Sequence, residues 1–445
     1  MTFICQKMTR QFVKDVWSTL KNSEENMKPT IREIANRFCD EPYRLFFPLG
    51  AIFGIVGVSH WLFYAVGWIK TYSFFFHSSI QIMVYMTCFV TGFLLTAMPR
   101  FSATRHASRS EILLFLACIF SIFVFLTFGC WIAAELSFLA WMLTLGRFGV
   151  SRFIKKKESP GGPNSPPLEF IWIPIAILHG VAGVLILTLS QARLIPAYLS
   201  VVGKPMVEQG FLLSVVVGVG GFLIPRVMGT FKAVASKETC TLEEVTRERR
   251  QSISFHLIMG IVLFISFWLE GFGFQVFGYA LRAVVVTGEF FHNGLLPRPP
   301  KVTDLFVRLV WLSVWMITLG YWLATFLPEY RVVTLHFVFI GGFSLMTFSI
   351  ATMVVMSHAG EGEKLRGSPW ILWVVVVGLA LALLKRITAI FFPDVYFNFL
   401  GAAALFWVLA DFSWLCFIAP RILKIPQADE FERLHEEAKR RLKEA

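Results

Sequence analysis

The sequence predicts an all-α membrane protein, a polytopic bundle of about twelve transmembrane helices. Apolar residues make up 56% of the 445-residue chain and charged residues only 16%, whereas soluble domains contain about 45–50% apolar and about 25% charged residues. Apolar runs follow one another along the chain, and most approach the roughly 20 residues that a helix needs to cross a bilayer. Basic residues are spread unequally over the loops between these runs, as expected for a fixed membrane topology.

The chain begins with a segment, residues 1–44, that mixes charged and apolar residues. It has no early apolar core ahead of a small-residue cleavage site, so we expect no secretory signal. The stretches 11–20 and 30–38 each suit a short amphipathic helix lying on the membrane surface.

The membrane domain is predicted over residues 45–419. Its apolar runs lie at about 45–68, 75–98, 111–129, 131–148, 169–190, 207–229, 253–269, 271–291, 305–326, 332–356, 370–391 and 395–419. Runs three and four, and runs seven and eight, lie so close together that each pair is either a tight hairpin or one long stretch. A Pro/Gly linker at 158–167 joins spans four and five, and no repeat is apparent. The tail 420–445 is predicted to form a charged helix with opposite charges four residues apart.

The net charge of +12 lies mostly in the short loops, so it indicates topology and not nucleic-acid binding. With both termini in the cytoplasm, the predicted inner loops hold 19 basic residues and the outer loops six. This excess favours an even number of spans with the basic side in the cytoplasm. The seven cysteines form no C-x-x-C pair, which favours small buried side chains over metal or redox use.

Three histidines fall in one layer of the predicted bundle. His77 and His336 begin spans two and ten, which both run inward, so both imidazoles lie about one turn below the outer surface. His60, near the end of span one, lies in the same layer. Imidazoles from separate helices suit the two faces of one haem in a dry apolar slot. Lys385 and Arg386, at the outer end of span eleven, are suited to bind haem propionates.

Two further histidines are weaker candidates for metal binding. His179 lies within span five, and an intramembrane histidine is a functional candidate by default. His358 ends span ten, about 33 Å from His336 along an ideal helix, so these two do not share a metal. A membrane histidine also often bonds a neighbouring carbonyl and binds no metal.

Ionisable residues also fall within the spans, and they should face the bundle interior because an unpaired buried charge costs several kcal/mol. These residues are Glu135, Glu270, Arg282, Glu289 and Asp411. Arg282 and Glu289 lie two turns apart on one helix face. They therefore suit a pair or a water-linked chain, with either a structural role or a role in proton delivery.

Five stretches of the chain carry a family resemblance. They are PYRLFFPLGAIF at 42–53 (which includes Arg44), FFFHSSIQIMVYMTCFVTGFLLTAMP at 74–99, GVGGFLIP at 218–225, the span 331–360 with His336, Gly341, Met346, Thr347, His358 and Gly360, and LLKRI at 383–387. In this order they resemble the NnrS family, the haem- and copper-containing membrane proteins linked to the bacterial nitric oxide response.

The resemblance implies a multi-pass protein of the bacterial inner membrane that holds a b-type haem. It implies His77, His336, His60, Arg44, Lys385 and Arg386 as cofactor contacts, with His77, His336, His179 and His358 as candidate metal ligands. It also implies nitric oxide or another small gas as ligand, surrounding lipid, and a redox partner or sister subunits. One departure argues against copper: the family's His-Ala-His-Glu motif is replaced here by His77, Ser78, Ser79 and Ile80.

Other functions remain open from the sequence. If the protein is an enzyme, we expect a haem-dependent oxidoreductase that acts on nitric oxide or in electron transfer. Because no close histidine pair is present to build a binuclear centre, oxygen reduction is not favoured. The alternatives are a twelve-span secondary transporter, for which no matched halves are apparent, and a non-catalytic subunit of a membrane redox complex.

Overall fold

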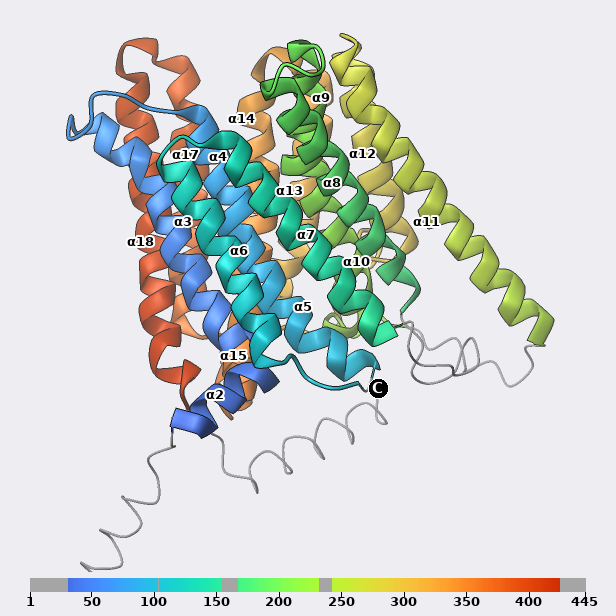
Figure 1. Ribbon diagram of the computed structural model, residues 1–445. Coiled ribbons are helices and arrows are strands. Elements are labelled where there is room, and N and C mark those ends of the chain that lie inside the picture. Colours follow the sequence, from blue (N-terminus) through green and yellow to red (C-terminus); the bar gives the residue numbers. More distant parts are fainter. Residues whose placement is uncertain (1–30, 103, 154–166, 232–241, 425–445) are drawn as a thin grey trace, which may run out of the picture.

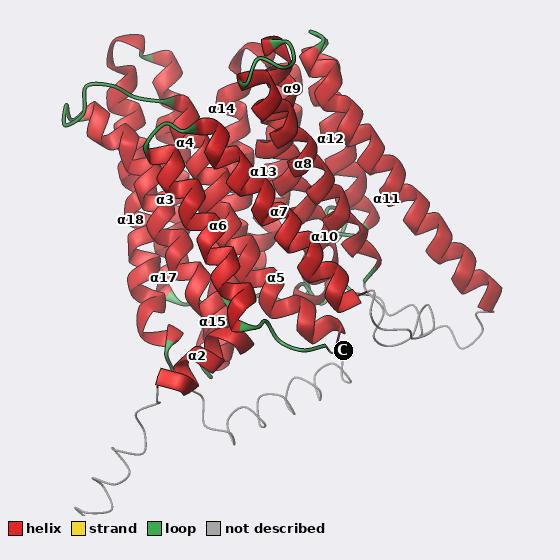
Figure 2. Ribbon diagram, in the orientation of Figure 1, coloured by secondary structure: helices red, strands yellow, loops and turns green. Residues whose placement is uncertain are grey.

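The computed structural model describes residues 31–102, 104–153, 167–231 and 242–424, and Figure 2 shows only helices and loops among them. Long helices run side by side from one end of the molecule to the other (Figure 1). The predicted helix 11–20, nearly all of the Pro/Gly linker and the charged tail beyond Lys424 lie outside the described residues. The second predicted surface helix is present as α2 (Ile31–Asp40).

The predicted spans are confirmed as helices, and both close pairs of runs are hairpins of two separate helices. Their bounds are α3 (Tyr43–Ala65), α4 (Phe74–Ile80), π-helix η1 (Gln81–Met86), α5 (Thr87–Ser102), α6 (Arg109–Thr127), α7 (Trp131–Phe153), α8 (Trp172–Gln191), α9 (Ser200–Pro205), π-helix η4 (Met206–Phe211), α10 (Leu212–Val227), α11 (Leu242–Gly271), α12 (Gln275–His292), α13 (Leu305–Phe326), α14 (Arg331–His336), π-helix η7 (Phe337–Ser344), α15 (Leu345–His358), α16 (Gly362–Arg366), α17 (Trp370–Thr388) and α18 (Tyr396–Ile422). Short 3₁₀ turns join several of them.

Ten helical segments among the described residues are long and apolar enough to cross a membrane. Two more, α7 and α12, run alongside them in the bundle (Figure 1). Both contain charged side chains that lower their hydropathy, including the buried Glu135 in α7 and the buried Arg282 and Glu289 in α12. Together these segments account for the twelve crossings that the sequence predicts.

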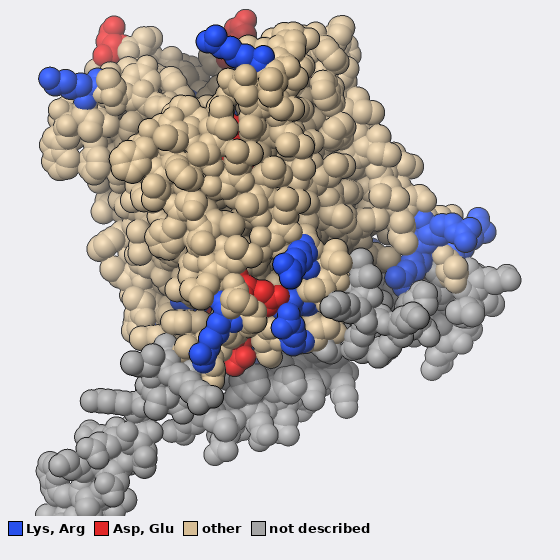
Figure 3. Space-filling model, in the orientation of Figure 1, with Lys and Arg blue, Asp and Glu red and all other residues tan. Residues whose placement is uncertain are grey.

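Charged side chains gather at the two ends of the bundle. Figure 3 shows Lys, Arg, Asp and Glu at both ends of the visible face, with a wide, almost uncharged band between them. One end, which we call the basic end, carries α2 together with Arg44, Arg100 and Arg152. The other end, which we call the opposite end, carries α4, α9 and α14. The uncharged band has the character of a surface in contact with lipid hydrocarbon.

The twelve segments form three consecutive units of four, an arrangement that was not apparent from the sequence. The units are α3–α7, α8–α12 and α13–α18, and in each the second segment is a short α-helix, a π-helical stretch and a longer α-helix. Each unit packs on the next, through α7 with α8, α12 with α13, and α18 with α3. The three units therefore close into a ring.

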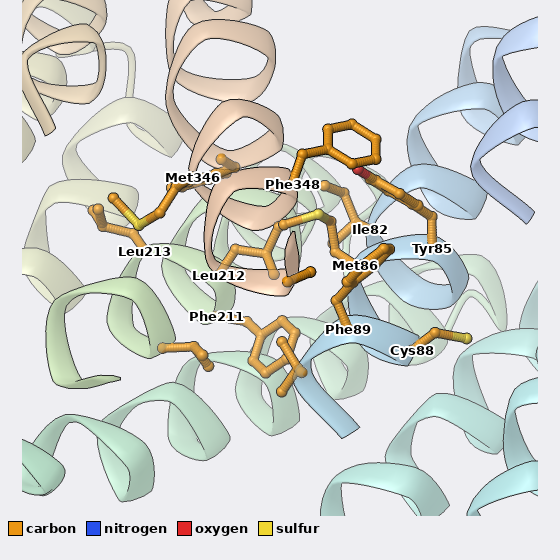
Figure 4. Close-up of a cluster of buried hydrophobic side chains, with 14 of the residues drawn as sticks. Ile82, Tyr85, Met86, Cys88, Phe89, Phe211, Leu212, Leu213, Met346 and Phe348 are labelled. Carbon is orange, nitrogen blue, oxygen red and sulfur yellow. The ribbon is translucent and has the colours of Figure 1, made fainter. Parts of the chain in front are cut away.

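Burial supports this threefold repeat. The second segments are the most buried: in their most apolar 18-residue stretches, 83%, 67% and 67% of the residues are buried. In the third segments the corresponding shares are only 33%, 28% and 33%. The second segments therefore line the centre and the third face outward. Figure 4 shows side chains from all three second segments in one apolar cluster, with Ile82 and Met86 from η1, Phe211 from η4, and Met346 from α15.

The π-helical stretches matter for function because such turns are rare and often occur at functional sites. Each wider turn changes which side chains point inward. The observed second segment of the middle unit also begins at Ala197, about ten residues before the predicted start. Lys204, predicted to lie in an outer loop, is therefore part of a central helix.

At the basic end, Glu361 ties the loop after α15 to the end of α18. Its carboxylate accepts hydrogen bonds from Arg421 Nε at 2.9 Å and Lys424 Nζ at 3.0 Å. Burial by itself raises the pKa of Glu361, but the hydrogen bonds and charges of Lys424 and Arg421 outweigh it. The pKa therefore lies below its ordinary value of 4.5.

Glu361→Gln should lower the stability of the protein at pH 7 by about 1.5–3 kcal/mol, the range for hydrogen bonds to a charged group. Because the folded-state pKa of Glu361 is depressed, its contribution is complete above pH 4.5 and is lost as the pH falls through the folded-state value. The variant should therefore melt lower at pH 7 and lose less on acidification, measured as Tm against pH in detergent. Glu363→Gln, on the exposed side of α16, is the control; equal effects of both changes would contradict the prediction.

Candidate functional site

His77 lies in α4 at the opposite end of the bundle. Ser73 begins this helix, since its side chain accepts a hydrogen bond from the Phe76 amide. The imidazole Nδ1 of His77 lies 2.9 Å from the Gly57 carbonyl oxygen on α3. A carbonyl only accepts hydrogen bonds, so Nδ1 carries the proton and Nε2 presents a lone pair.

His336 has the same arrangement in the third unit. It is the last residue of α14, directly before the π-helical stretch η7, and its Nδ1 lies 2.6 Å from the carbonyl oxygen of Val332. Its Nε2 therefore also presents a lone pair. Both imidazoles are half-buried, and no described residue forms a hydrogen bond with either Nε2 atom.

The fold brings the two histidines together with Arg386. The imidazoles of His77 and His336 lie close enough to interact electrostatically, and the Arg386 guanidinium interacts with both. Arg386 is 8% exposed, and its Nη1 has no hydrogen-bond partner among the described residues. A buried guanidinium nitrogen without an acceptor suits a carboxylate ligand.

These side chains fit the haem expected from the sequence. Two Nε2 lone pairs suit axial haem ligands, because the Nδ1–H···O=C bonds hold the tautomer and the ring orientation. The unpaired nitrogen of Arg386 suits a propionate. A haem has two propionates, and Lys204 provides a second cation near His77.

Lys204 and its neighbour Glu208 were missed as site residues in the sequence. They lie on α9 and η4, with Lys204 Nζ 3.6 Å from Glu208 Oε1, and both are only partly buried. Glu208 also contacts Ser78, the residue after His77. The four-residue spacing of a lysine and a glutamate at the start of a span was the available signal.

Two other predicted residues of this layer have different contacts. His60 lies near His77, but its Nε2 accepts a hydrogen bond from the Ser73 amide at 2.7 Å, so that lone pair is already used. Lys385 points toward Phe399, with its Nζ 5.3 Å from the ring centroid. Of the two predicted propionate partners, Arg386 is the one that faces the histidines.

Arg44 and His358 lie at the basic end, away from His77 and His336. Arg44 is buried, bonds Glu41, and donates to the carbonyl of Ile422 at the end of α18 at 2.5 Å. His358 Nε2 lies 2.7 Å from Arg100 Nη1, so its lone pair accepts from that guanidinium. The structure therefore does not bring these two residues into the histidine layer.

His179 is fully buried in α8, the first helix of the middle unit. Its Nδ1 bonds the carbonyl of Ile175 at 2.8 Å, and its Nε2 has no partner among the described residues. Phe264 and Phe267 pack around the ring at 5.7 and 5.6 Å. This imidazole therefore lies in an aromatic pocket, with no second imidazole in contact.

The buried charges pair differently from the predicted Arg282–Glu289 interaction. Arg282 forms an ion pair with Glu270 on α11, and Glu289 bonds His256 Nδ1 at 2.8 Å. The direct pair is therefore not formed, because each residue has a partner on α11 at its own level of the bundle. Arg282 also donates to Gln209 Oε1 at 3.1 Å, which links this pair to η4.

Within the described part of the chain, no group of three or more His, Cys, Asp or Glu residues is arranged to hold a metal ion. In the stretch that replaces the expected His-Ala-His-Glu motif, Ser79 is buried and Ile80 packs in the core. A haem with two axial imidazoles needs only two protein ligands, so the histidine layer suits that group better than an isolated metal ion.

Comparison with known proteins agrees with the resemblance found in the sequence. A family model described as NnrS protein matches residues 37–425, which is most of the chain. A search of curated proteins found no significant match. The matched region runs from α2 to the end of α18 and includes every residue of the histidine layer.

Proposed function

Because this chain belongs to the NnrS family, we propose that it is a haem-binding membrane protein of the response to, or metabolism of, nitric oxide and related nitrogen oxides. His77 and His336 would hold the haem, and Arg386 and Lys204 would bind its propionates. The main support is one observation: two neighbouring imidazoles, whose Nε2 atoms accept no hydrogen bond from the described residues, lie beside a buried guanidinium whose Nη1 has no acceptor among them.

The protein groups have distinct roles in this proposal. The carbonyls of Gly57 and Val332 orient the imidazoles and hold the protons on Nδ1. Arg386 supplies a fixed positive charge in a site of low dielectric constant, where such a charge interacts strongly with a carboxylate. When bound, haem supplies electron transfer if both imidazoles ligate it, and gas binding if one ligand position is open.

We place the protein in the bacterial inner membrane, with the basic end in the cytoplasm. The support is the loop charge, because an excess of Lys and Arg is typical of cytoplasmic loops. The histidine layer then lies near the external face. A small uncharged gas such as nitric oxide would reach it from solution or through lipid, and a redox partner would supply electrons.

The test is the absorption spectrum and haem content of the purified full-length protein, without and with nitric oxide. We expect a six-coordinate low-spin haem spectrum, with about one haem per chain. Addition of nitric oxide to the reduced protein should shift the Soret band if a histidine can be displaced. A colourless preparation that is folded by circular dichroism, even after incubation with haemin, would overturn the proposal and favour a transporter or a non-catalytic subunit.

A further inference from the structure

Asp411 is a buried carboxyl group for which the haem layer gives no role. It lies in the middle of α18, the last segment of the ring, and its side chain is 0% exposed. Neither carboxyl oxygen has a hydrogen-bond partner among the described residues. A buried polar group usually has at least one partner, so this carboxyl group needs an explanation.

Two aromatic side chains lie beside it. A Cβ atom at Gly54 would lie 3.0 Å from Asp411 Oδ2, 2.7 Å from Tyr85 Cδ2 and 2.8 Å from Trp407 Cη2. The missing side chain at Gly54 therefore allows Asp411, Tyr85 and Trp407 to meet against the backbone of α3. The rings of Tyr85 and Trp407 cross edge to face, with their centroids 5.5 Å apart.

Tyr85 is the polar neighbour of Asp411. Its hydroxyl lies close enough to Asp411 to interact electrostatically and is approached by Ser344 of η7, although no hydrogen bond of normal geometry forms. Figure 4 shows the Tyr85 side chain beside Phe348 within the apolar cluster. Tyr85 and Trp407 therefore lie beside Asp411, and Tyr85 carries a titratable hydroxyl.

Among the described residues, no basic side chain forms an ion pair or a hydrogen bond with Asp411. An ionised carboxylate without a counter-charge in a membrane interior costs several kcal/mol, whereas a carboxylic acid carries no charge. A bound cation would need several oxygen or nitrogen ligands, whereas the two side chains that meet Asp411 at Gly54 present ring edges. A proton is the ligand that this site accommodates.

We propose that Asp411, together with Tyr85, forms a proton-binding site in the middle of the membrane that exchanges protons with the space beside His77. Tyr85, Gln81 and His77 follow one another at four-residue intervals along η1 and α4. Gln81 Nε2 donates to the Gly54 carbonyl at 3.0 Å, so it faces the same helix, α3, as Tyr85 and His77. These three side chains form a polar line from Asp411 toward the histidine layer.

Proton exchange at this site is one for one. When the Asp411 O–H bond breaks, the proton passes to the Tyr85 hydroxyl oxygen as that hydroxyl gives its own proton to a water molecule on the side of Gln81. The carboxylate that remains then takes up one proton, ultimately from water. The proton-binding site requires no cofactor. Only its use as a proton donor to the haem layer rests on the proposed function.

Infrared spectroscopy of the full-length protein tests the site. A protonated carboxyl group gives a C=O stretching band separate from that of carboxylates, and this band shifts in D₂O. Other buried carboxyl groups contribute to the band, so the assignment comes from the difference between wild type and Asp411→Asn. We expect this difference spectrum to contain one carboxylic acid band. Glu361→Gln is the control and should leave that band in place, because Glu361 is an ion-paired carboxylate.

Three more variants keep the test decisive. Asp411→Glu keeps a carboxyl group and should retain the band at a shifted frequency, so it remains informative if the asparagine variant misfolds. Tyr85→Phe should shift the band without removing it. Gln81→Leu should slow the exchange of the band in D₂O. A folded Asp411→Asn protein with an unchanged carboxylic acid band would overturn the site, and unaltered exchange in Gln81→Leu would overturn the connection to His77. None of these measurements requires haem, so they remain informative if the proposed function fails.

Discussion

Replacement of His77 or His336 by alanine should remove nearly all haem from the protein while the bundle remains folded. In the proposed site each imidazole would supply one axial ligand, and the nearby imidazole of His60 already uses its Nε2 to accept from the Ser73 amide. Loss of hydrogen-bond partners around a bound group typically costs about 10–100-fold in affinity, and loss of a ligand itself should cost more. The measurement is the ratio of haem to protein after purification, with folding checked by circular dichroism.

His106→Ala is the matched control, since His106 is exposed in a loop at the basic end and contacts Arg152 only through its backbone carbonyl. Its haem content should equal that of wild type. Arg386→Leu should lower haem affinity less than either histidine variant, because it removes a propionate partner and no axial ligand. Full haem retention in both the His77 and the His336 variants would reject this assignment of the ligands.

Removal of the charge of Glu270 should destabilise the protein by about 3–5 kcal/mol, the range measured when one partner of a buried ion pair is lost. Arg282 is 0% exposed, and Glu270 is its carboxylate partner. Phe267 and Tyr279 stack on the guanidinium, with ring centroids 4.1 and 4.5 Å from its central carbon. Glu270→Gln would leave this cation buried without a counter-charge, which should appear as a large fall in Tm in detergent.

Glu329→Gln is the control for this change, because Glu329 is exposed in the turn before α14. It should alter stability by less than about 0.5 kcal/mol. The double variant Glu270→Leu with Arg282→Met should recover most of the lost stability, since apolar residues of similar volume often replace a buried pair at little cost. A Glu270→Gln protein that melts with wild type would show that the pair carries little energy.

The sequence by itself determined the positions of residues along the membrane normal. Apolar run length predicted the spans, because a helix in lipid must satisfy its backbone hydrogen bonds internally. It left open whether residues 128–130 and 272–274 are turns, and the structure shows that they are. The same positions predicted that His77, His336 and Arg386 share a layer, and in the structure the Arg386 guanidinium lies close enough to both imidazoles to interact with them. The π-helical stretches were not predictable, since they follow from contacts between helices and not from hydropathy.

Only the tertiary structure decided which side chains meet across that layer. Rotation of each helix about its own axis, and its displacement by the π turns, depend on packing against neighbours far away in the chain. For this reason Arg282 pairs with Glu270 and not with Glu289, and Asp411 of the last helix meets Tyr85 of the second. Hydropathy sets the depth of a residue in the membrane, whereas packing in the closed ring of three units sets its partners.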